Sequence, residues 1–115
     1  KPIVGVYAEN ASEIYVLNSD ISNYPTGIDN KSGSLYVINT NIDVTDTGIN
    51  GYTGRIINSK INSPKVGIIA NAWIRVIDTK ITGSNVAGSI GVSGYDKWTD
   101  EFNASNTGNT HIYGT

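Results

Sequence analysis

One nine-residue phrase occurs four times in this chain, and this recurrence constrains the fold more than any other feature. The copies are YVLNSDISN from Tyr15, YVINTNIDV from Tyr36, RIINSKINS from Arg55 and RVIDTKITG from Arg75. Their fourth residues are spaced by 21, 19 and 20 positions, at Asn18, Asn39, Asn58 and Asp78. A period near 20 residues is typical of a solenoid, in which each repeat forms one turn. We call such a turn a coil.

Period-two alternation assigns the residues of each copy to the interior or to the surface, because successive strand side chains point to opposite faces. The pattern predicts three short strands and three corners in each coil. A glycine nine residues after each Asn opens the third strand, and we expect these glycines to adopt backbone angles that side chains resist; they are Gly27, Gly48 and Gly67. The predicted inward residues of the first strand are Ile14, Val16, Leu35, Val37, Gly54, Ile56, Ile74 and Val76. Those of the second strand are Ile21, Ile42, Ile61 and Ile81, and those of the third are Val6, Ile28, Ile49 and Ile68. The same alternation places Asn18, Asn39, Asn58 and Asp78 on the inward face.

The sequence V-x-N-S/T-x-I followed by GI resembles the coil repeat of right-handed parallel β-helix proteins, such as pectate lyases and phage tailspikes. The resemblance covers Gly5 to Val92. It implies an all-β, single-stranded right-handed parallel β-helix of four to five coils over residues 1–92, followed by a non-repeat tail over residues 93–115. It also implies a ladder of stacked amides at Asn18, Asn39 and Asn58. We expect this ladder to end at Asp78, because an ionised Asp cannot donate a hydrogen bond.

The outward side of the first strand carries a column of aliphatic residues, namely Leu17, Ile38, Ile57 and Ile77. A contiguous apolar strip of this kind usually marks an interaction surface. Two covers are available, the chain's own tail or a neighbouring copy. We favour the tail because its aromatic residues otherwise have no core to join; they are Tyr95, Trp98, Phe102 and Tyr113.

The first predicted strand leaves an uncapped edge, which invites another chain to pair with it. We expect Ile3, Val4 and Val6 to form this edge, and either the last coil or a late strand containing Ile112 and Tyr113 to pair with it in the next copy. Repeated head-to-tail contacts of this kind produce filaments unless the rotation closes a ring.

Charge and composition exclude several classes of protein. The net charge is −2, and the eight Lys and Arg residues form no cluster, so nucleic-acid binding is not expected. No apolar run approaches the roughly 20 residues of a membrane span. The chain has no Cys, and we predict neither a cofactor nor a metal site. The segment KPIVGVYAEN lacks the apolar core of a signal peptide, so we expect a mature product or an excised fragment.

The columns of equivalent residues give little support for an enzyme. Glycoside hydrolysis needs two carboxyl groups about 5 to 10 Å apart. Asp20 shares its column with Asn41, Lys60 and Lys80, and Asp29 shares its column with Asn50 and Ile69. Asp43 and Asp46 are ordinary turn residues, with a weak Ca²⁺ site as the alternative. We interpret the only histidine, His111, as a plain tail residue.

Three further patterns on the predicted surface remain open to more than one interpretation. Lys60 and Lys80, with Arg55 and Arg75 nearby, either disperse charge against Asp20 and Glu13 or contact an acidic glycan or the acidic end of another subunit. Tyr15, Tyr36, Tyr52 and Trp73 are candidates for stacking on sugars. Asn10, Asn30 and Asn103 begin N-glycosylation sequons, and each lies at a predicted corner or in the tail.

Two hypotheses of function follow. The first is a non-catalytic structural β-solenoid subunit, extracellular or on a cell or virion surface, which assembles head to tail into a filament or fibre. The second is a fragment of a polysaccharide-binding or polysaccharide-cleaving β-helix protein of the tailspike or pectate-lyase kind. We favour the first, because enzymes of this family generally use more coils than this chain provides.

Overall fold

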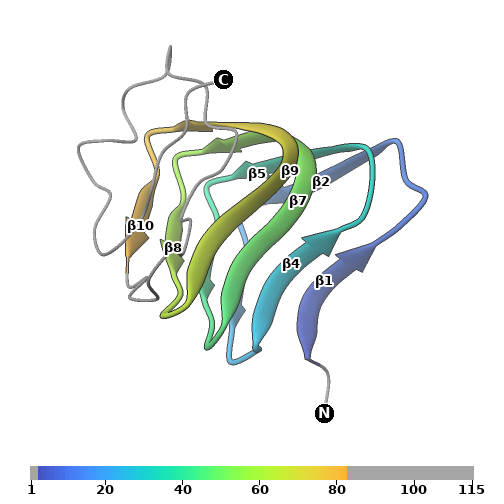
Figure 1. The fold of residues 1–115 in the computed structure, drawn as a ribbon. Helices are drawn as coiled ribbons and strands as arrows, with labels where there is room; N and C mark the ends of the chain where they lie inside the picture. The colour runs from blue at the N-terminus through green and yellow to red at the C-terminus, as the bar shows by residue number, and fades with distance from the viewer. Residues whose placement is uncertain (1–2, 83–115) are drawn as a thin grey trace.

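Residues 3–82 are described in the computed structural model of the chain, and they form a parallel β-solenoid (Figure 1). All regular structure in this range is strand, which confirms the predicted all-β fold. The strands are β1 (Val4–Ala8), β2 (Glu13–Leu17), β3 (Asp20–Ser22), β4 (Thr26–Asn30), β5 (Ser34–Ile38), β6 (Asn41–Asp43), β7 (Thr47–Ile57), β8 (Lys60–Asn62), β9 (Val66–Ile77) and β10 (Lys80–Thr82). The described range holds no helix of the length and apolarity that crossing a membrane requires.

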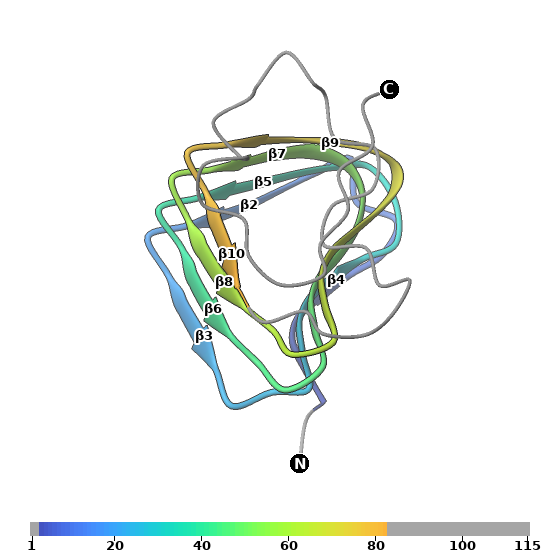
Figure 2. The ribbon, with the colours of Figure 1, turned by 60° about the vertical axis from the view of Figure 1, so that its left-hand side comes forward.

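The strands wind around a common axis and build three faces (Figure 2). The first face consists of β1, β4 and the amino-terminal parts of β7 and β9. The second consists of β2, β5 and the carboxyl-terminal parts of β7 and β9, and the third of β3, β6, β8 and β10. The described residues therefore form four coils with the predicted spacing of about 20 residues. Residues 83–92 and the predicted tail, residues 93–115, lie outside the described range.

Parallel pairing places equivalent residues of successive coils opposite one another. On the second face, for example, Val16 pairs with Val37, Val37 with Ile56, and Ile56 with Val76. Neighbouring strands lie about 4.8 Å apart, so each side chain contacts its equivalents in the coils before and after it. The predicted register is confirmed on all three faces.

Aliphatic side chains from the three faces meet inside the solenoid and form one core. The positions that alternation predicts to be inward are buried in the second, third and fourth coils, and Ile28, Val37, Ile42, Ile56 and Ile81 are at most 1% exposed. In the first coil, Val6 and Ile14 are only partly buried. The interior is thus an aliphatic stack, in which branched side chains fit the pleated strands.

Three separate strands were predicted for every coil, but the structure differs at the junction between the first and second faces. In the third and fourth coils, β7 and β9 run continuously through this corner, with a register irregularity between Gly51 and Thr53. In the first two coils, short loops separate β1 from β2 and β4 from β5. Because the distance from each corner Asn to the following glycine is constant at nine residues, the unequal coil lengths arise only at this junction.

The prediction that Gly27, Gly48 and Gly67 need unusual backbone angles is wrong, since the glycines with positive φ in the described range are Gly33 and Gly54. The reason for glycine is close approach between coils. A Cβ at Gly27 would lie 2.6 Å from the carbonyl oxygen of Gly48, and one at Gly48 would lie 2.5 Å from that of Gly67. Only a residue without a side chain lets the strands stack at this position.

The inward and outward neighbours Ile56 and Ile57 provide a direct test of the register. Ile56 is fully buried, whereas Ile57 lies partly exposed on the outer surface. We expect Ile56→Ala to lower the free energy of unfolding by about 2–5 kcal/mol, because it leaves a cavity in a packed core. Ile57→Ala should cost clearly less. Urea-induced unfolding followed by circular dichroism measures both, and equal losses would contradict the assignment of faces.

Candidate functional site

The corner between the second and third faces is the most regular polar feature of the molecule. Asn18, Asn39, Asn58 and Asp78 all adopt left-handed backbone conformations here, with φ of 51°, 53°, 49° and 49°. Asn and Asp tolerate this conformation better than other residues with side chains. All four side chains are exposed, so the prediction that they point inward is wrong. The left-handed residue turns the chain and interrupts the alternation, which carries its side chain to the outside.

The exposed amides of this corner form a hydrogen-bonded ladder along the solenoid. The Nδ2 of Asn39 donates to the Oδ1 of Asn18 at 3.1 Å, and the Nδ2 of Asn58 donates to the Oδ1 of Asn39 at 2.5 Å. In each bond the later coil donates to the earlier one. Asp78 occupies the next position of the column and offers only acceptor atoms when ionised.

Hydroxyl groups, for which the corner motif predicted no role of their own, occupy the inner side of the same corner. Thr40, Ser59 and Thr79 are buried directly after the exposed corner residues, and Ser19 is partly buried. The backbone N–H of Thr40 donates to the Oγ of Ser59 at 3.1 Å, and that of Ser59 donates to the Oγ1 of Thr79 at 3.3 Å. Each hydroxyl in turn donates to the carbonyl two residues before it. The signal was present as the Ser or Thr that follows every corner residue.

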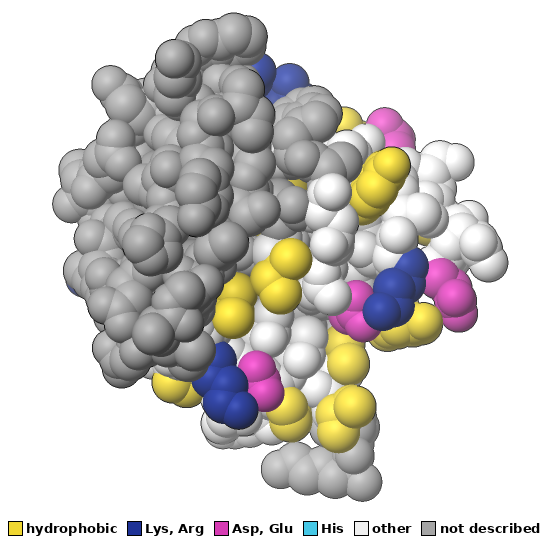
Figure 3. Space-filling view, in the orientation of Figure 1, with side chains coloured by type: hydrophobic (Ala, Val, Ile, Leu, Met, Phe, Trp, Pro, Cys, Tyr) yellow, Lys and Arg dark blue, Asp and Glu magenta, His cyan; other side chains and the backbone are white. Residues whose placement is uncertain are grey.

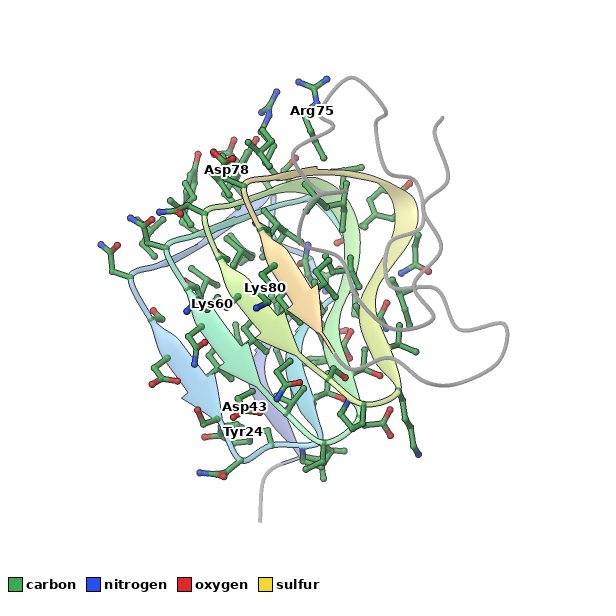
Figure 4. All side chains as sticks on the ribbon, turned by 90° about the vertical axis from the view of Figure 1, so that its left-hand side faces the viewer. Tyr24, Asp43, Lys60, Arg75, Asp78 and Lys80 are labelled. Atoms are coloured by element: carbon green, nitrogen blue, oxygen red, sulfur yellow. The ribbon has the colours of Figure 1, made fainter. Side chains whose placement is uncertain are left out.

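A shallow, open groove runs outside this corner onto the third face. Its volume is about 620 Å³, and its lining is Asn18, Ser19, Asp20, Asn39, Thr40, Asn41, Asn58 and Lys60. A second hollow of about 330 Å³ shares Asn41 and Lys60 and extends to Lys80. Figure 4 shows Lys60 and Lys80 on neighbouring strands of this face. The groove therefore offers amide groups beside the Asp20 carboxylate and the Lys60 ammonium group, and the second hollow adds the Asp43 carboxylate and the Lys80 ammonium group.

The outer surface of the second face combines aromatic, cationic and aliphatic side chains. The rings of Tyr15 and Tyr36 stack with their centroids 4.8 Å apart, and Arg55 follows Tyr36 in register. Partial desolvation, followed by the charge of Glu13, raises the pKa of the Tyr15 phenol above its ordinary value of 10.0. The predicted aliphatic column is in register, with Leu17 47% exposed and Ile38, Ile57 and Ile77 partly exposed.

The remaining predicted site residues do not gather at one place, and some of them lie outside the described part of the chain. Ile3 is 67% exposed at the edge of the first coil, beside the partly buried Val4 and Val6. Asn10 is exposed at a corner, whereas Asn30 is only 1% exposed. A side chain buried to this extent does not admit a glycan, so the structure contradicts the prediction for Asn30. Ile112, Tyr113, Asn103 and His111 lie outside the described residues.

Four acidic side chains of the described range, namely Asp20, Asp29, Asp43 and Asp46, accept from amides or pair with lysines. Asp43 accepts from the Nδ2 of Asn62 at 3.2 Å. The Nζ of Lys65 lies 3.6 Å from the Oδ2 of Asp46, and the Nζ of Lys31 lies 3.2 Å from the Oδ2 of Asp29. Figure 3 shows basic and acidic side chains next to each other on one face of the molecule. Among residues 3–82, no three His, Asp or Glu side chains gather at one point. The chemistry that these groups offer is hydrogen bonding and charge pairing.

Comparison with known proteins adds no relative to this description. The sequence matches no protein-family model, and neither the curated proteins nor the solved structures provide a significant match. The parallel β-solenoid is therefore established by the strand pairing itself, and the function is inferred from the surface.

The amide ladder yields a prediction that separates backbone strain from hydrogen bonding. Asn39→Ala removes both amide bonds and places alanine in a left-handed conformation, so we expect a loss of about 2 kcal/mol in unfolding free energy. Asn39→Gly removes the same bonds without the steric penalty and should cost about 1 kcal/mol less. Urea titrations of both variants give the difference. A glycine variant no more stable than the alanine variant would contradict the left-handed assignment.

Proposed function

We propose that this chain is a non-catalytic structural β-solenoid subunit that assembles end to end into a filament or fibre. The observation that carries this proposal is the incomplete core of the first coil. Val16 and Ile21 are each 7% exposed, whereas their equivalents one coil later, Val37 and Ile42, are 0% exposed. Within the described range β1, β2 and β3 pair with a neighbour on one side only. Burial of this edge by a further strand completes both the core and the hydrogen bonding.

Charge complementarity along the axis supports a second copy as the partner. Residues 3–22, which form the first coil, contain three acidic side chains and no basic ones, namely Glu9, Glu13 and Asp20. Residues 54–82 contain one acidic side chain, Asp78, and five basic ones, namely Arg55, Lys60, Lys65, Arg75 and Lys80. An end-to-end contact brings the acidic end of one copy to the basic end of the next, which steers association and fixes its direction.

The proposed contact uses the edge formed by Ile3, Val4 and Val6. Its partner is the later end of a second copy, either the last coil or a strand around Ile112 and Tyr113. The polarity of the amide ladder suits the same arrangement. In the ladder, the amide of each later coil donates to the amide of the coil before it. By the same pattern, the Nδ2 of Asn18 is directed toward the open edge of the first coil. There it can donate to an acceptor at the later end of a preceding copy, such as the carboxylate of Asp78.

The coil repeat also supports a place in the right-handed pectate-lyase-like and tailspike-like superfamily. On this resemblance we propose that the chain lies on a cell or virion surface or in the extracellular space. The partner in this proposal is a further copy of the same chain, and the assembly is a homo-oligomer or filament.

Electron microscopy of the purified chain tests the assembly, and we expect long unbranched filaments. Asp20→Lys reverses a charge on the first coil and should raise the concentration needed for assembly about tenfold. Asp43→Lys is the matched control, because it makes the same exchange at an exposed, amide-bonded position one coil further on. Dispersed monomers or closed trimers of the wild-type chain would contradict the proposal.

A second candidate function is polysaccharide binding, favoured by the stacked Tyr15 and Tyr36 rings. The two rings form a stack on the outer surface, and the Tyr15 ring at one end of this stack is 57% exposed, so the apolar face of a sugar can pack on it. The groove lined by Asn39, Asn58 and Lys60 adds hydrogen-bond donors for hydroxyl and carboxylate groups.

The polysaccharide hypothesis predicts measurable binding in an array of acidic and neutral polysaccharides. Tyr15→Ala should weaken such binding about threefold to tenfold, because it removes one of the two stacked aromatic rings. Tyr7→Ala is the control, since Tyr7 is comparably exposed, at 53% against 57%, but lies on the first face. Absence of binding to the whole array, or equal effects of the two variants, would count against this function.

A further inference from the structure

The outer surface of the second face carries a column whose chemistry changes at its centre. Tyr15 and Tyr36 occupy the first two coils of this column, and Arg55 and Arg75 occupy the next two. The aliphatic column runs beside it, two residues further along each strand. Figure 4 shows Arg75 directed away from the solenoid. The face thus has an aromatic half and a cationic half, with an apolar strip along both.

We propose that this face binds the same face of a second copy, with the two solenoid axes antiparallel. The two copies are related by a two-fold axis that is parallel to the strands and passes between the second and third coils. This axis reverses the order of the coils in the second copy and places each column of residues opposite the same column of the second copy. Tyr36 then faces Arg55 of the second copy, and Tyr15 faces its Arg75. Such an interface is isologous, so every contact occurs twice.

The aliphatic column becomes self-complementary under the same operation. Leu17, 47% exposed in the first coil, comes to lie over Ile77 of the second copy, and Ile38 comes to lie over Ile57. The apolar strip that a single copy leaves partly in water is covered over its full length. Under this operation the first coil, which contains Glu13, faces the fourth coil of the second copy. The carboxylate of Glu13 is then close to the cationic half of the second copy, so opposite charges meet.

The alternative face-to-face arrangement is unfavourable. A two-fold axis parallel to the solenoid axis keeps the coils in the same order and exchanges the outer columns. It places Arg55 and Arg75 beside their own equivalents, and it sets the aliphatic column against the polar column that begins at Glu13. Like charges repel in this arrangement, and apolar side chains meet polar ones. The order of Tyr and Arg along the column therefore selects the antiparallel dimer.

The Tyr15 and Tyr36 rings stack face to face along the column, so a second copy meets their edges and hydroxyl groups. The attraction comes from hydrogen bonds that the guanidinium groups donate to the phenol oxygens and from burial of the aliphatic strip. Five-residue strands at about 3.3 Å per residue and four strands at about 4.8 Å give a face of about 300 Å² per copy. Stable interfaces bury about 800 Å² per partner, so two isolated copies should associate weakly. In a filament the face recurs in every subunit, and side-by-side pairing of two antiparallel filaments adds these contacts together.

The lateral contact is measured in an Asp20→Lys background, which weakens end-to-end assembly. Electron microscopy first establishes that filaments are absent at the concentrations used, so that this inference is tested separately from the proposed function. Sedimentation of the full chain from micromolar to millimolar concentration should show a monomer–dimer equilibrium. Tyr36→Arg places two arginines opposite each other at the interface and should weaken the dimer about tenfold or more. Adding Arg55→Asp to Tyr36→Arg should restore dimerisation, because the facing groups become oppositely charged.

Tyr52→Arg is the control, since it makes the same exchange at a residue that is 45% exposed and lies outside the four-residue column. It should leave the dimer unchanged. If Tyr36→Arg is poorly folded by circular dichroism, Arg55→Ala provides the same readout through loss of the guanidinium group. A chain that stays monomeric at millimolar concentration, as expected if its own tail covers the face, overturns the inference. So does a dimer that Tyr36→Arg and Tyr52→Arg affect equally.

Discussion

Parallel hydrogen bonding between successive coils is the constraint on which the rest of the structure depends. It fixes the distance between coils at about 4.8 Å and places each residue on its equivalent in the next coil. The aliphatic core, the exposed amide ladder, the buried hydroxyls and the stacked Tyr15 and Tyr36 rings are four results of this one arrangement. A side chain in this fold is therefore selected largely for how it contacts a copy of itself.

Residue types differ in how well they tolerate such self-contact. Isoleucine gains by packing on isoleucine, and an amide can donate to one neighbour and accept from the other. Lysine on lysine gains nothing, yet Lys60 and Lys80 lie in register on the third face. Arg55 and Arg75 do so on the second face. The requirements of folding do not explain the positions where a column changes from neutral to charged side chains, and the proposed lateral interface begins from such a position.

The sequence predicted the core and the register well because both depend on periodicity, and aliphatic residues such as Ile28, Ile49 and Ile68 recur with the period of the fold. It failed where one residue changes the direction of the chain. Alternation carries Asn39 inward, whereas its left-handed conformation turns it outward and directs Thr40 inward instead. The reason for Gly48 was equally hidden, because the contact that excludes a side chain comes from Gly67 in the next coil. Of the candidate site, the columns were predictable and the direction of the corner side chains was not.

The junction between the first and second faces has a consequence for how such a chain can change. It is crossed by a loop in the first two coils and by continuous strand in the third and fourth, while the other two corners keep a constant length. Insertions and deletions are therefore accommodated at one edge of the prism without shifting any column. That edge is where a gene could acquire a new loop, or an engineer could graft one, while the stack beneath it keeps its register.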